Sequence, residues 1–286
     1  MTIDIAPLRQ HLGRKVEDRD TATQAPLKGM IATFDRDETA PEPGQPIAPG
    51  WHLAYLHNYA RPAALGEDGL PVESDVLPPM PFPRRMYAGS TFTFEDDIRV
   101  GDALRRETEF TDVQLRSGST GALIVTAQTR RIFTPRGLAV VEVASTVFRE
   151  EVKAGARSGV PVRDAAPTDV PWRRTIEADP VKLFRYSALT FNPHRIHYDR
   201  TYCIETEGYP GLVVHGPFAQ QCILDLLRDS MPGRPIKSLA IRARAPLFDT
   251  APFDVIGRPT ADGTGAELWT VTPQGTIAAQ ATATLG

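Results

Sequence analysis

Apolar and polar residues follow two different periods along the chain. Within residues 1–40, apolar positions recur at mixed three- and four-residue spacing, which predicts helices. From Met86 to about residue 150 the alternation has a period of two, and turn signals such as Gly101-Asp102 and Pro135-Arg136-Gly137 interrupt it. This half therefore predicts helix followed by an antiparallel meander.

The same order recurs in the second half. Residues 178–190 predict a helix, residues 217–227 predict a buried apolar helix with Pro217 in its first turn, and residues 237–286 return to strands. A glycine-rich turn opens a long strand at residues 118–123 and again at 263–268, about half a chain length apart. The repeat predicts a duplicated α+β fold in which each helix is wrapped by a curled antiparallel sheet.

Three stretches are predicted to be loops or linkers. Residues 153–172 are poor in large apolar side chains and rich in Gly, Pro, Ala and Asp, so we interpret them as a linker between an N-terminal unit, 1–152, and a C-terminal unit, 173–286. Residues 41–50 and 61–83 are proline-rich loops. A loop as long as the second is expected to lie across a ligand or a partner surface.

Composition excludes some classes of partner. The chain of 286 residues has 32 Lys+Arg and 35 Asp+Glu, a net charge of −3, which argues against nucleic acid as its main partner. No run approaches the roughly 20 apolar residues of a membrane span, and residues 1–15 hold no secretory signal, so a cytoplasmic protein is expected. Phosphate-loop, dinucleotide-binding, serine-hydrolase elbow and two-cysteine metal motifs are absent from the sequence.

Histidine carries the main chemical signal. Three of the six histidines, His194, His197 and His215, lie in a polar loop that leads into the most apolar helix. Asn192 precedes a proline and is biased to extended backbone, so it can share one small volume with His197, a candidate acid–base group. The alternative is a hydrogen-bonded loop histidine. Metal binding by His194 and His197 is not expected, because no carboxylate completes the set and Arg195 repels a cation.

Other candidates surround this loop. Gly216 precedes Pro217 at a helix start, where free backbone N–H groups and the helix dipole could stabilise an oxyanion; alternatively Gly216 is only the helix cap. His215 is expected to be structural rather than catalytic. Arg84 and Arg85 could hold a phosphate or carboxylate, or be surface charges. Trp51, Tyr55 and Tyr87 are expected in the core or the pocket lining.

The two segments Phe184–Asp199 and Glu207–Pro217 resemble the C-terminal half of a MaoC-like hot-dog dehydratase. The resemblance is to the branch of type 2 hydroxyacyl-thioester dehydratases and mesaconyl-CoA and itaconyl-CoA hydratases, and it extends to Trp51-His52 and Pro83–Gly89. It implies a double hot-dog fold with two wrapped central helices. The N-terminal half would shape the acyl pocket without catalysing, and the C-terminal half would carry the hydratase loop.

The hydratase loop of the wider family reads Asp-x-Asn-Pro-x-His, and this chain departs from it twice. Asn192 and His197 match, but Thr190 stands at the aspartate position and the proline-to-histidine spacing is two residues longer. The resemblance then implies that His197 takes both proton-transfer roles while Thr190 and Asn192 position water, or that a carboxylate from elsewhere substitutes. It also supports Gly216 as the oxyanion hole.

The implied activity is reversible hydration of an enoyl-CoA, with no metal or redox cofactor and with coenzyme A as part of the substrate. Arg84, Arg85 and Arg195, with His215 near the acyl group, favour a short branched dicarboxylyl-CoA such as mesaconyl-CoA or itaconyl-CoA. A fatty 3-hydroxyacyl-thioester dehydratase is the alternative, and the carrier could be acyl carrier protein. From other classes, a thioesterase using Asp225 or Glu207 and a non-catalytic acyl-thioester-binding module stay open. A homodimer is compatible with all of these.

Overall fold

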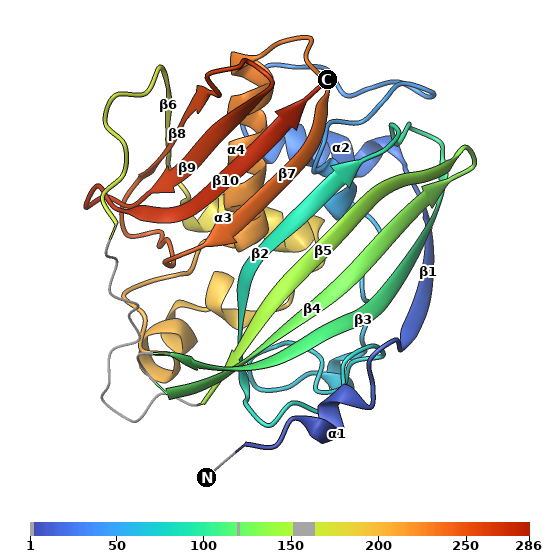
Figure 1. Cartoon of the computed structure of the whole chain (residues 1–286), viewed down its shortest axis with the longest axis vertical. Coiled ribbons are helices and arrows are strands. Elements are labelled where there is room, and N and C mark those ends of the chain that lie inside the picture. The colour runs from blue at the N-terminus through green and yellow to red at the C-terminus, as the bar shows by residue number, and fades with distance from the viewer. Residues whose placement is uncertain (1–2, 119–120, 151–163) are drawn as a thin grey trace.

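A curved antiparallel sheet dominates this computed structural model, which describes residues 3–118, 121–150 and 164–286. Helices lie on the concave side of the sheet (Figure 1). The strands are β1 Lys15–Thr21, β2 Arg84–Phe94, β3 Ala103–Gly118, β4 Gly121–Thr134, β5 Gly137–Arg149, β6 Trp172–Ile176, β7 Ile236–Ala243, β8 Phe253–Pro259, β9 Gly265–Val271 and β10 Ile277–Leu285. The helices are α1 Ala6–Arg9, α2 Gln24–Thr33, α3 Pro180–Leu189 and α4 Gly216–Ser230, with short turns η1 Trp51–Ala54, η2 Pro62–Ala64, η3 Arg195–His197 and η4 Tyr202–Thr206.

The strand order is that of a duplicated sheet. It runs β1-β3-β4-β5-β2-β7-β10-β9-β8-β6, so each half contributes five strands and the two halves join where β2 pairs with β7. β4 and β9, which begin at Gly121 and Gly265, occupy the third place from their respective edges. The repeat predicted from these two glycine turns is therefore confirmed, and so is the α+β class.

Gly89 lies at the seam between the halves. Its φ is +142°, and a Cβ there would lie 2.1 Å from the carbonyl oxygen of Ile241 on β7. Only glycine accepts both the backbone conformation and the close approach of the neighbouring strand. Pairing of β2 with β7 removes one exposed edge from each half, which protects both against edge-to-edge association.

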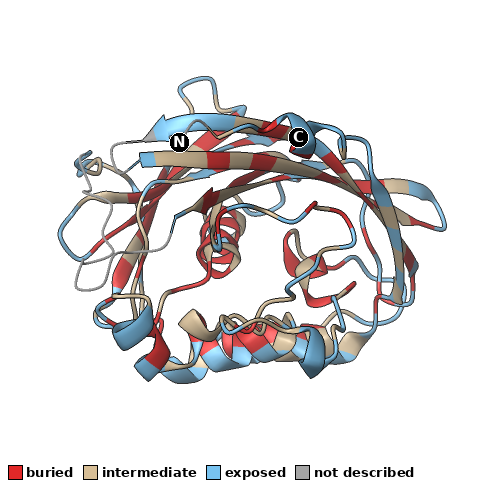
Figure 2. Cartoon of the chain, turned by 90° about the horizontal axis from the view of Figure 1, so that it is seen from below, coloured by how far each residue is buried: buried red, intermediate tan, exposed pale blue. Residues whose placement is uncertain are grey.

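Helix α4 is the central helix of the second half. Every residue from Phe218 to Leu227 is buried; seven of these ten are apolar, and Gln220, Gln221 and Asp225 have hydrogen-bond partners. Figure 2 shows the sheet curving around buried helical segments. Helix α3, which precedes the hydratase loop, is capped by Asp179, whose carboxylate accepts hydrogen bonds from the backbone N–H groups of Val181 and Lys182.

The first half lacks a counterpart of α4. Between α2 and β2 the described chain forms only the 3-10 turns η1 and η2 and irregular backbone. Proline recurs through residues 41–83, and proline in a helix interior removes a hydrogen bond and clashes with the preceding turn. The expectation of two wrapped central helices is therefore met by a long helix in the second half only.

Two further expectations need correction or stay open. Residues 1–40 are not helical throughout, because Lys15–Thr21 is the edge strand β1. β1 has one apolar residue, pairs antiparallel with β3, and makes ion pairs with it such as Lys15–Glu109. A charged edge strand of this kind cannot be recognised from hydrophobic periodicity. Of the linker predicted at 153–172, residues 153–163 lie outside the described part. The unit boundaries stay a prediction, compatible with the division of strands between β5 and β6.

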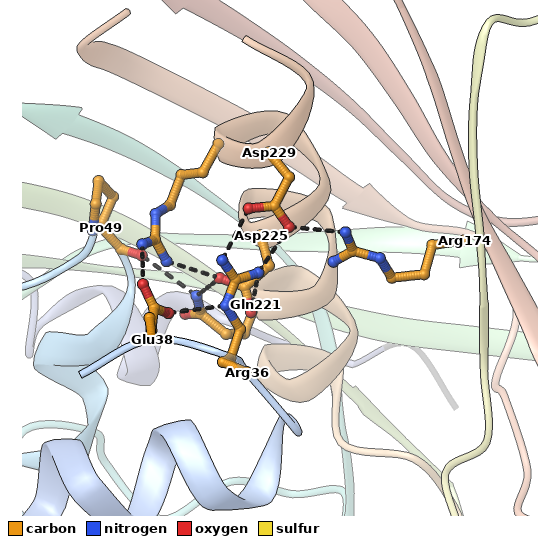
Figure 3. A network of polar contacts seen from close by, with 8 residues as sticks. Arg36, Glu38, Pro49, Arg174, Gln221, Asp225 and Asp229 are labelled. Atoms are coloured by element: carbon orange, nitrogen blue, oxygen red, sulfur yellow. Dashed lines mark hydrogen bonds and ion pairs between the residues drawn. The ribbon is translucent and has the colours of Figure 1, made fainter. Parts of the chain in front are cut away.

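A polar network fixes the C-terminal half of α4 (Figure 3). Arg36 from the first half bonds both oxygens of Asp229 at 2.8 Å, and Arg174 of β6 bonds the same carboxylate at 2.7 Å. One turn earlier, Asp225 is 2% exposed and accepts a hydrogen bond from Gln221, and burial raises its pKa. The network connects the C-terminal half of α4 to both halves of the chain, whereas the N-terminus of α4 lines the cavity.

Candidate active site

A cavity of about 1120 Å³ lies between the two halves. The first half supplies part of its wall from β2, β4, β5 and the loop around residues 66–72. The second half supplies the loop 192–215, the N-terminus of α4 and residues of β7, β9 and β10. Of the predicted site residues, the cavity is lined by Arg84, Arg85, Asn192, His197, His215 and Gly216.

His197 lines this cavity, and its Nε2 has no hydrogen-bond partner among the described residues. The residue ends the turn η3, is 7% exposed, and its Nδ1 lies 2.7 Å from the carbonyl oxygen of Val213. A carbonyl can only accept, so Nδ1 carries the proton and Nε2 keeps its lone pair. Burial, followed by the neighbouring His194, lowers the pKa of His197 to about 3. The imidazole is therefore neutral at pH 7 and able to accept a proton.

His215 backs His197 and leads directly into α4. The two rings stack with their centroids 3.7 Å apart, and Nε2 of His215 lies 2.8 Å from the hydroxyl oxygen of Ser187. Its Nδ1 is buried without a partner among the described residues, and burial holds its pKa well below the ordinary value. His215 is the N-cap residue of α4, so the stack places the base beside the start of that helix.

Gly216 exposes the first backbone N–H of α4. No side chain caps this end of the helix, and the next residue, Pro217, has no N–H. The ring of Tyr87 covers the glycine so closely that a Cβ would lie 2.2 Å from its Cδ1, while the Tyr87 hydroxyl donates to Gln220 at 2.9 Å. A free N–H at the positive end of a helix dipole is suited to stabilising a developing oxyanion.

The structure separates Asn192 from Thr190. Asn192 lines the cavity, and its Oδ1 accepts a hydrogen bond from the backbone of His194 at 3.1 Å, which leaves the amide nitrogen as a donor. Thr190 lies at the C-cap of α3, where its hydroxyl donates to the carbonyl of Tyr186 at 2.7 Å. It is not among the cavity-lining residues. The structure therefore does not bring the Thr190 hydroxyl to a water beside His197.

Two of the three candidate arginines are occupied by carboxylates. Arg84 donates to Glu207 at 2.6 and 2.9 Å and to the Tyr209 hydroxyl at 3.1 Å. Arg195 bonds Asp199 at 2.7 Å, and it does not line the cavity. Both guanidinium groups thus serve the structure of the site rather than presenting an open charge to it.

Arg85 keeps donors available. Its Nη2 bonds the carbonyl oxygen of Pro71 at 2.9 Å, and its shortest ion-pair contact within the described ranges is 3.7 Å, between Nε and Asp68. Burial lowers its pKa, as expected for a guanidinium that lacks a close counter-ion. A ligand carboxylate entering the cavity would therefore meet open donors at Arg85, and Arg244 is a further cation in the lining.

Three of the four cavity-lining acids in the described residues have partners. Glu207 pairs with Arg84, Glu142 accepts hydrogen bonds from Ser90 and Arg130, and Asp68 accepts one from the backbone of Leu70. The fourth, Glu67, is exposed. Asp225, the acid that a thioesterase would use, belongs to the network of Figure 3 and does not line the cavity. The described residues contain no group of three His, Cys, Asp or Glu side chains arranged to hold a metal ion.

His194 also belongs to the site, although the sequence suggested only a metal-ligand role for it, which was not expected. It lines the cavity, and its ring centroid lies 5.4 Å from that of His197 in an edge-to-face arrangement. Burial, followed by the charges of Arg85 and Arg84, lowers its pKa to about 4. The available signal was a second histidine in the same short loop, three residues before His197.

Comparison with known proteins identifies the class. The family model for hydroxyacyl-thioester dehydratase type 2 matches residues 50–249. Across 280 residues the chain is 38% identical to mesaconyl-C(4)-CoA hydratase of Chloroflexus aurantiacus, covering 96% of each protein. It is also 37% identical over 78 residues to the mitochondrial hydroxyacyl-thioester dehydratase type 2 of Schizosaccharomyces pombe, 27% of this chain and 26% of that protein.

Solved structures agree on the fold. A MaoC-like dehydratase from Phytophthora capsici superposes with a TM-score of 0.67 at 13% identity and 99% coverage of both chains. A Mycobacterium tuberculosis protein described as a double hot-dog gives 0.60 at 12% identity and 96% coverage of both. The chain therefore belongs to the hydroxyacyl-thioester dehydratase type 2 family of MaoC-like double hot-dog proteins, and it is a hydro-lyase. No described helix is long and apolar enough to span a membrane.

Proposed function

We propose that this protein reversibly hydrates the double bond of a short, branched dicarboxylyl-CoA, with mesaconyl-C(4)-CoA as the first candidate. The observation that carries the proposal is the bare Nε2 of His197, which faces a cavity whose wall includes the open N-terminus of α4. A base beside an oxyanion site is the arrangement that addition of water to an enoyl thioester requires.

The chain's own residues suffice for a balanced reaction. The backbone N–H of Gly216 donates to the thioester oxygen, which makes the β-carbon electrophilic. His197 takes one proton from a water that the Asn192 amide orients, and the water oxygen bonds to the β-carbon while charge moves to the thioester oxygen. His197 then returns the proton to the α-carbon, and the carbonyl re-forms. No metal or redox cofactor takes part in this scheme.

The dicarboxylyl substrate follows from Arg85. In mesaconyl-C(4)-CoA the thioester is on carbon 4, so the β-carbon that receives water also carries a methyl group and the free carboxylate. That carboxylate must lie close to the water held at His197. A guanidinium with open donors in the same cavity matches an anion at this position. Arg84 and Arg195 are less suited to this role, because each is already paired with a carboxylate.

The alternatives differ in measurable products. A fatty enoyl thioester would use the same base without an anion to hold, thioester hydrolysis would release a free thiol, and a binding module would convert nothing. The occupied states of Asp225 and Glu207 disfavour hydrolysis. The acyl carrier, a homodimeric state and a cytoplasmic location stay predictions.

The purified chain should be given mesaconyl-C(4)-CoA and crotonyl-CoA separately, following loss of enoyl absorbance together with free thiol. We expect hydration of mesaconyl-C(4)-CoA with the higher kcat/KM and no thiol release. The variant His57→Gln, outside the cavity, is the matched control for histidine substitutions. Preference for crotonyl-CoA would overturn the dicarboxylyl substrate, and thiol release would overturn hydration.

A further inference from the structure

The extended loop presents an imidazole that the hydration scheme does not use to the cavity. His194 lines the cavity next to His197, yet its ring nitrogens have no hydrogen-bond partner in the part of the chain that the structure describes. The catalytic scheme above gives it no proton to carry. A polar ring in the wall of a ligand cavity is expected to contact the ligand.

The first half of the molecule holds this loop in place. The backbone N–H of Arg195 donates to the carbonyl of Asp68 at 2.8 Å, and the Arg195 guanidinium bonds the carbonyl of Glu67 at 3.0 Å. Gly69, with φ of +84°, lies so close that a Cβ would be 2.1 Å from the carbonyl oxygen of Pro193. The long loop predicted to cross a ligand surface thus clamps the residues on either side of His194.

The same loop also fixes Arg85. The carbonyl of Pro71 accepts a hydrogen bond from Arg85, and Asp68 lies 3.7 Å from its Nε. One short segment, residues 67–71, therefore contacts both Arg85 and the backbone flanking His194, although these lie in opposite halves of the chain. This shared support brings a guanidinium and a neutral imidazole to one wall of one cavity.

We propose that His194 is a specificity-determining residue that donates a hydrogen bond from its neutral ring to the free carboxylate on the substrate's β-carbon, beside Arg85. The proposal rests on the dicarboxylyl substrate proposed above. A half-buried N–H donor to a carboxylate discriminates between substrates, because an uncharged substrate leaves that donor unpaired. His197 keeps the base role, so His194 should govern which acyl group is accepted rather than whether water adds.

A matched pair of substrates isolates this role. In 3-methylcrotonyl-CoA a methyl group replaces the carboxylate of mesaconyl-C(4)-CoA, so the ratio of their kcat/KM values measures carboxylate recognition. We expect His194→Ala to lower kcat/KM for mesaconyl-C(4)-CoA by about 10- to 100-fold. We expect crotonyl-CoA and 3-methylcrotonyl-CoA to change less than about threefold. His194→Asn, which keeps an N–H donor, should retain part of the selectivity.

The clamp has its own matched control. Gly69→Ala should lower selectivity for the carboxylate in the same direction as His194→Ala, because the added Cβ pushes against Pro193. Gly44→Ala has nearly the same φ, +82°, with nothing within 4 Å of the new Cβ, and should leave selectivity unchanged. Equal losses in Gly69→Ala and Gly44→Ala would show that the segment has no role in recognition.

Binding of saturated analogues separates this proposal from the hydration chemistry. The saturated counterpart of mesaconyl-C(4)-CoA and isovaleryl-CoA also differ by a carboxylate against a methyl group, and their affinities need no turnover. Wild type should bind the carboxylate analogue more tightly, and His194→Ala should lose that preference. Equal loss of both analogues, or no loss of either, would overturn the role of His194. Failure of all enoyl-CoA hydration would overturn the proposed function even if this binding preference stood.

Discussion

The two halves of this protein share one sheet plan but differ in what the sheet encloses. In the second half, α4 fills the concave side and the loop before it carries His197 and His215. In the first half, the corresponding stretch between α2 and β2 forms no long helix, and its loop 67–71 supports Arg85 and the hydratase loop instead. Both halves of the sheet are needed, because β2 of one half pairs with β7 of the other. A long central helix is present in one half only, and residues of the other half form part of the cavity wall.

After loss of the base itself, the largest effect is expected where the halves touch at the oxyanion site. Gly216→Ala pushes a Cβ to 2.2 Å from the Tyr87 ring, so Tyr87 or the start of α4 must shift. We expect kcat to fall by about 100-fold, the usual scale for losing an oxyanion donor. The double variant Gly216→Ala/Tyr87→Ala should approach the rate of Tyr87→Ala alone. A wild-type rate in Gly216→Ala would show that this backbone group does not contact the reacting thioester.

The seam tests whether the halves are stable only as a pair. Gly89→Ala combines φ of +142° with a contact of 2.1 Å to Ile241, and we expect it to lower the free energy of unfolding by about 3 kcal/mol. Gly137→Ala, at φ of +123° with open space around it, supplies the backbone strain alone and should cost about 1 kcal/mol. Urea denaturation measures both. Equal losses would mean that the β2–β7 contact tolerates a side chain.

Acid should destabilise the fold, mainly through histidines of the second half. Burial lowers the pKa of His197 to about 3 and of His194 to about 4, against about 6.5 in an unfolded chain. The unfolded state therefore binds more protons below pH 6.5, and stability present above that pH is lost as the pH falls toward 4. Each such histidine contributes up to about 1.4 kcal/mol per pH unit. Urea denaturation at pH 7, 6 and 5 should give a shallower slope for His197→Gln, and an unchanged slope would contradict its buried neutral state.

The smallest effect is expected at Thr190. Its hydroxyl serves the end of α3, so Thr190→Val should cost about 1 kcal/mol of stability and change kcat/KM less than about threefold. Thermal denaturation and the hydration assay together decide the point. A large fall in kcat with unchanged stability would restore Thr190 to the water-positioning role that the sequence comparison gave it.

Local patterns predicted most of the scaffold, and the site residues stay a prediction. The period-two stretches indicated the long strands. The polar loop before an apolar helix pointed to His197 and Gly216, which line the same cavity. The edge strand β1 was not predicted, because one apolar residue, Val16, is too few to show a period.

The role of Arg84 could not be predicted, because its partner is distant: Glu207, 123 residues away, accepts its hydrogen bonds. Arg195 is different, because its carboxylate partner Asp199 lies four residues further along the chain, and only its contact with the Glu67 carbonyl is distant. Arg85, adjacent to Arg84 in the chain, lines the same cavity but has different partners: the Pro71 carbonyl and Asp68.

The most direct test of the central claim is the pH dependence of hydration by wild type beside the rate of His197→Gln. A base kept neutral by burial predicts that kcat/KM for the free enzyme shows no acid limb near pH 6.5 and holds down to about pH 5, while His197→Gln loses about 1000-fold in kcat. An ordinary acid limb near pH 6.5, or a His197→Gln variant within tenfold of wild type, would contradict the account.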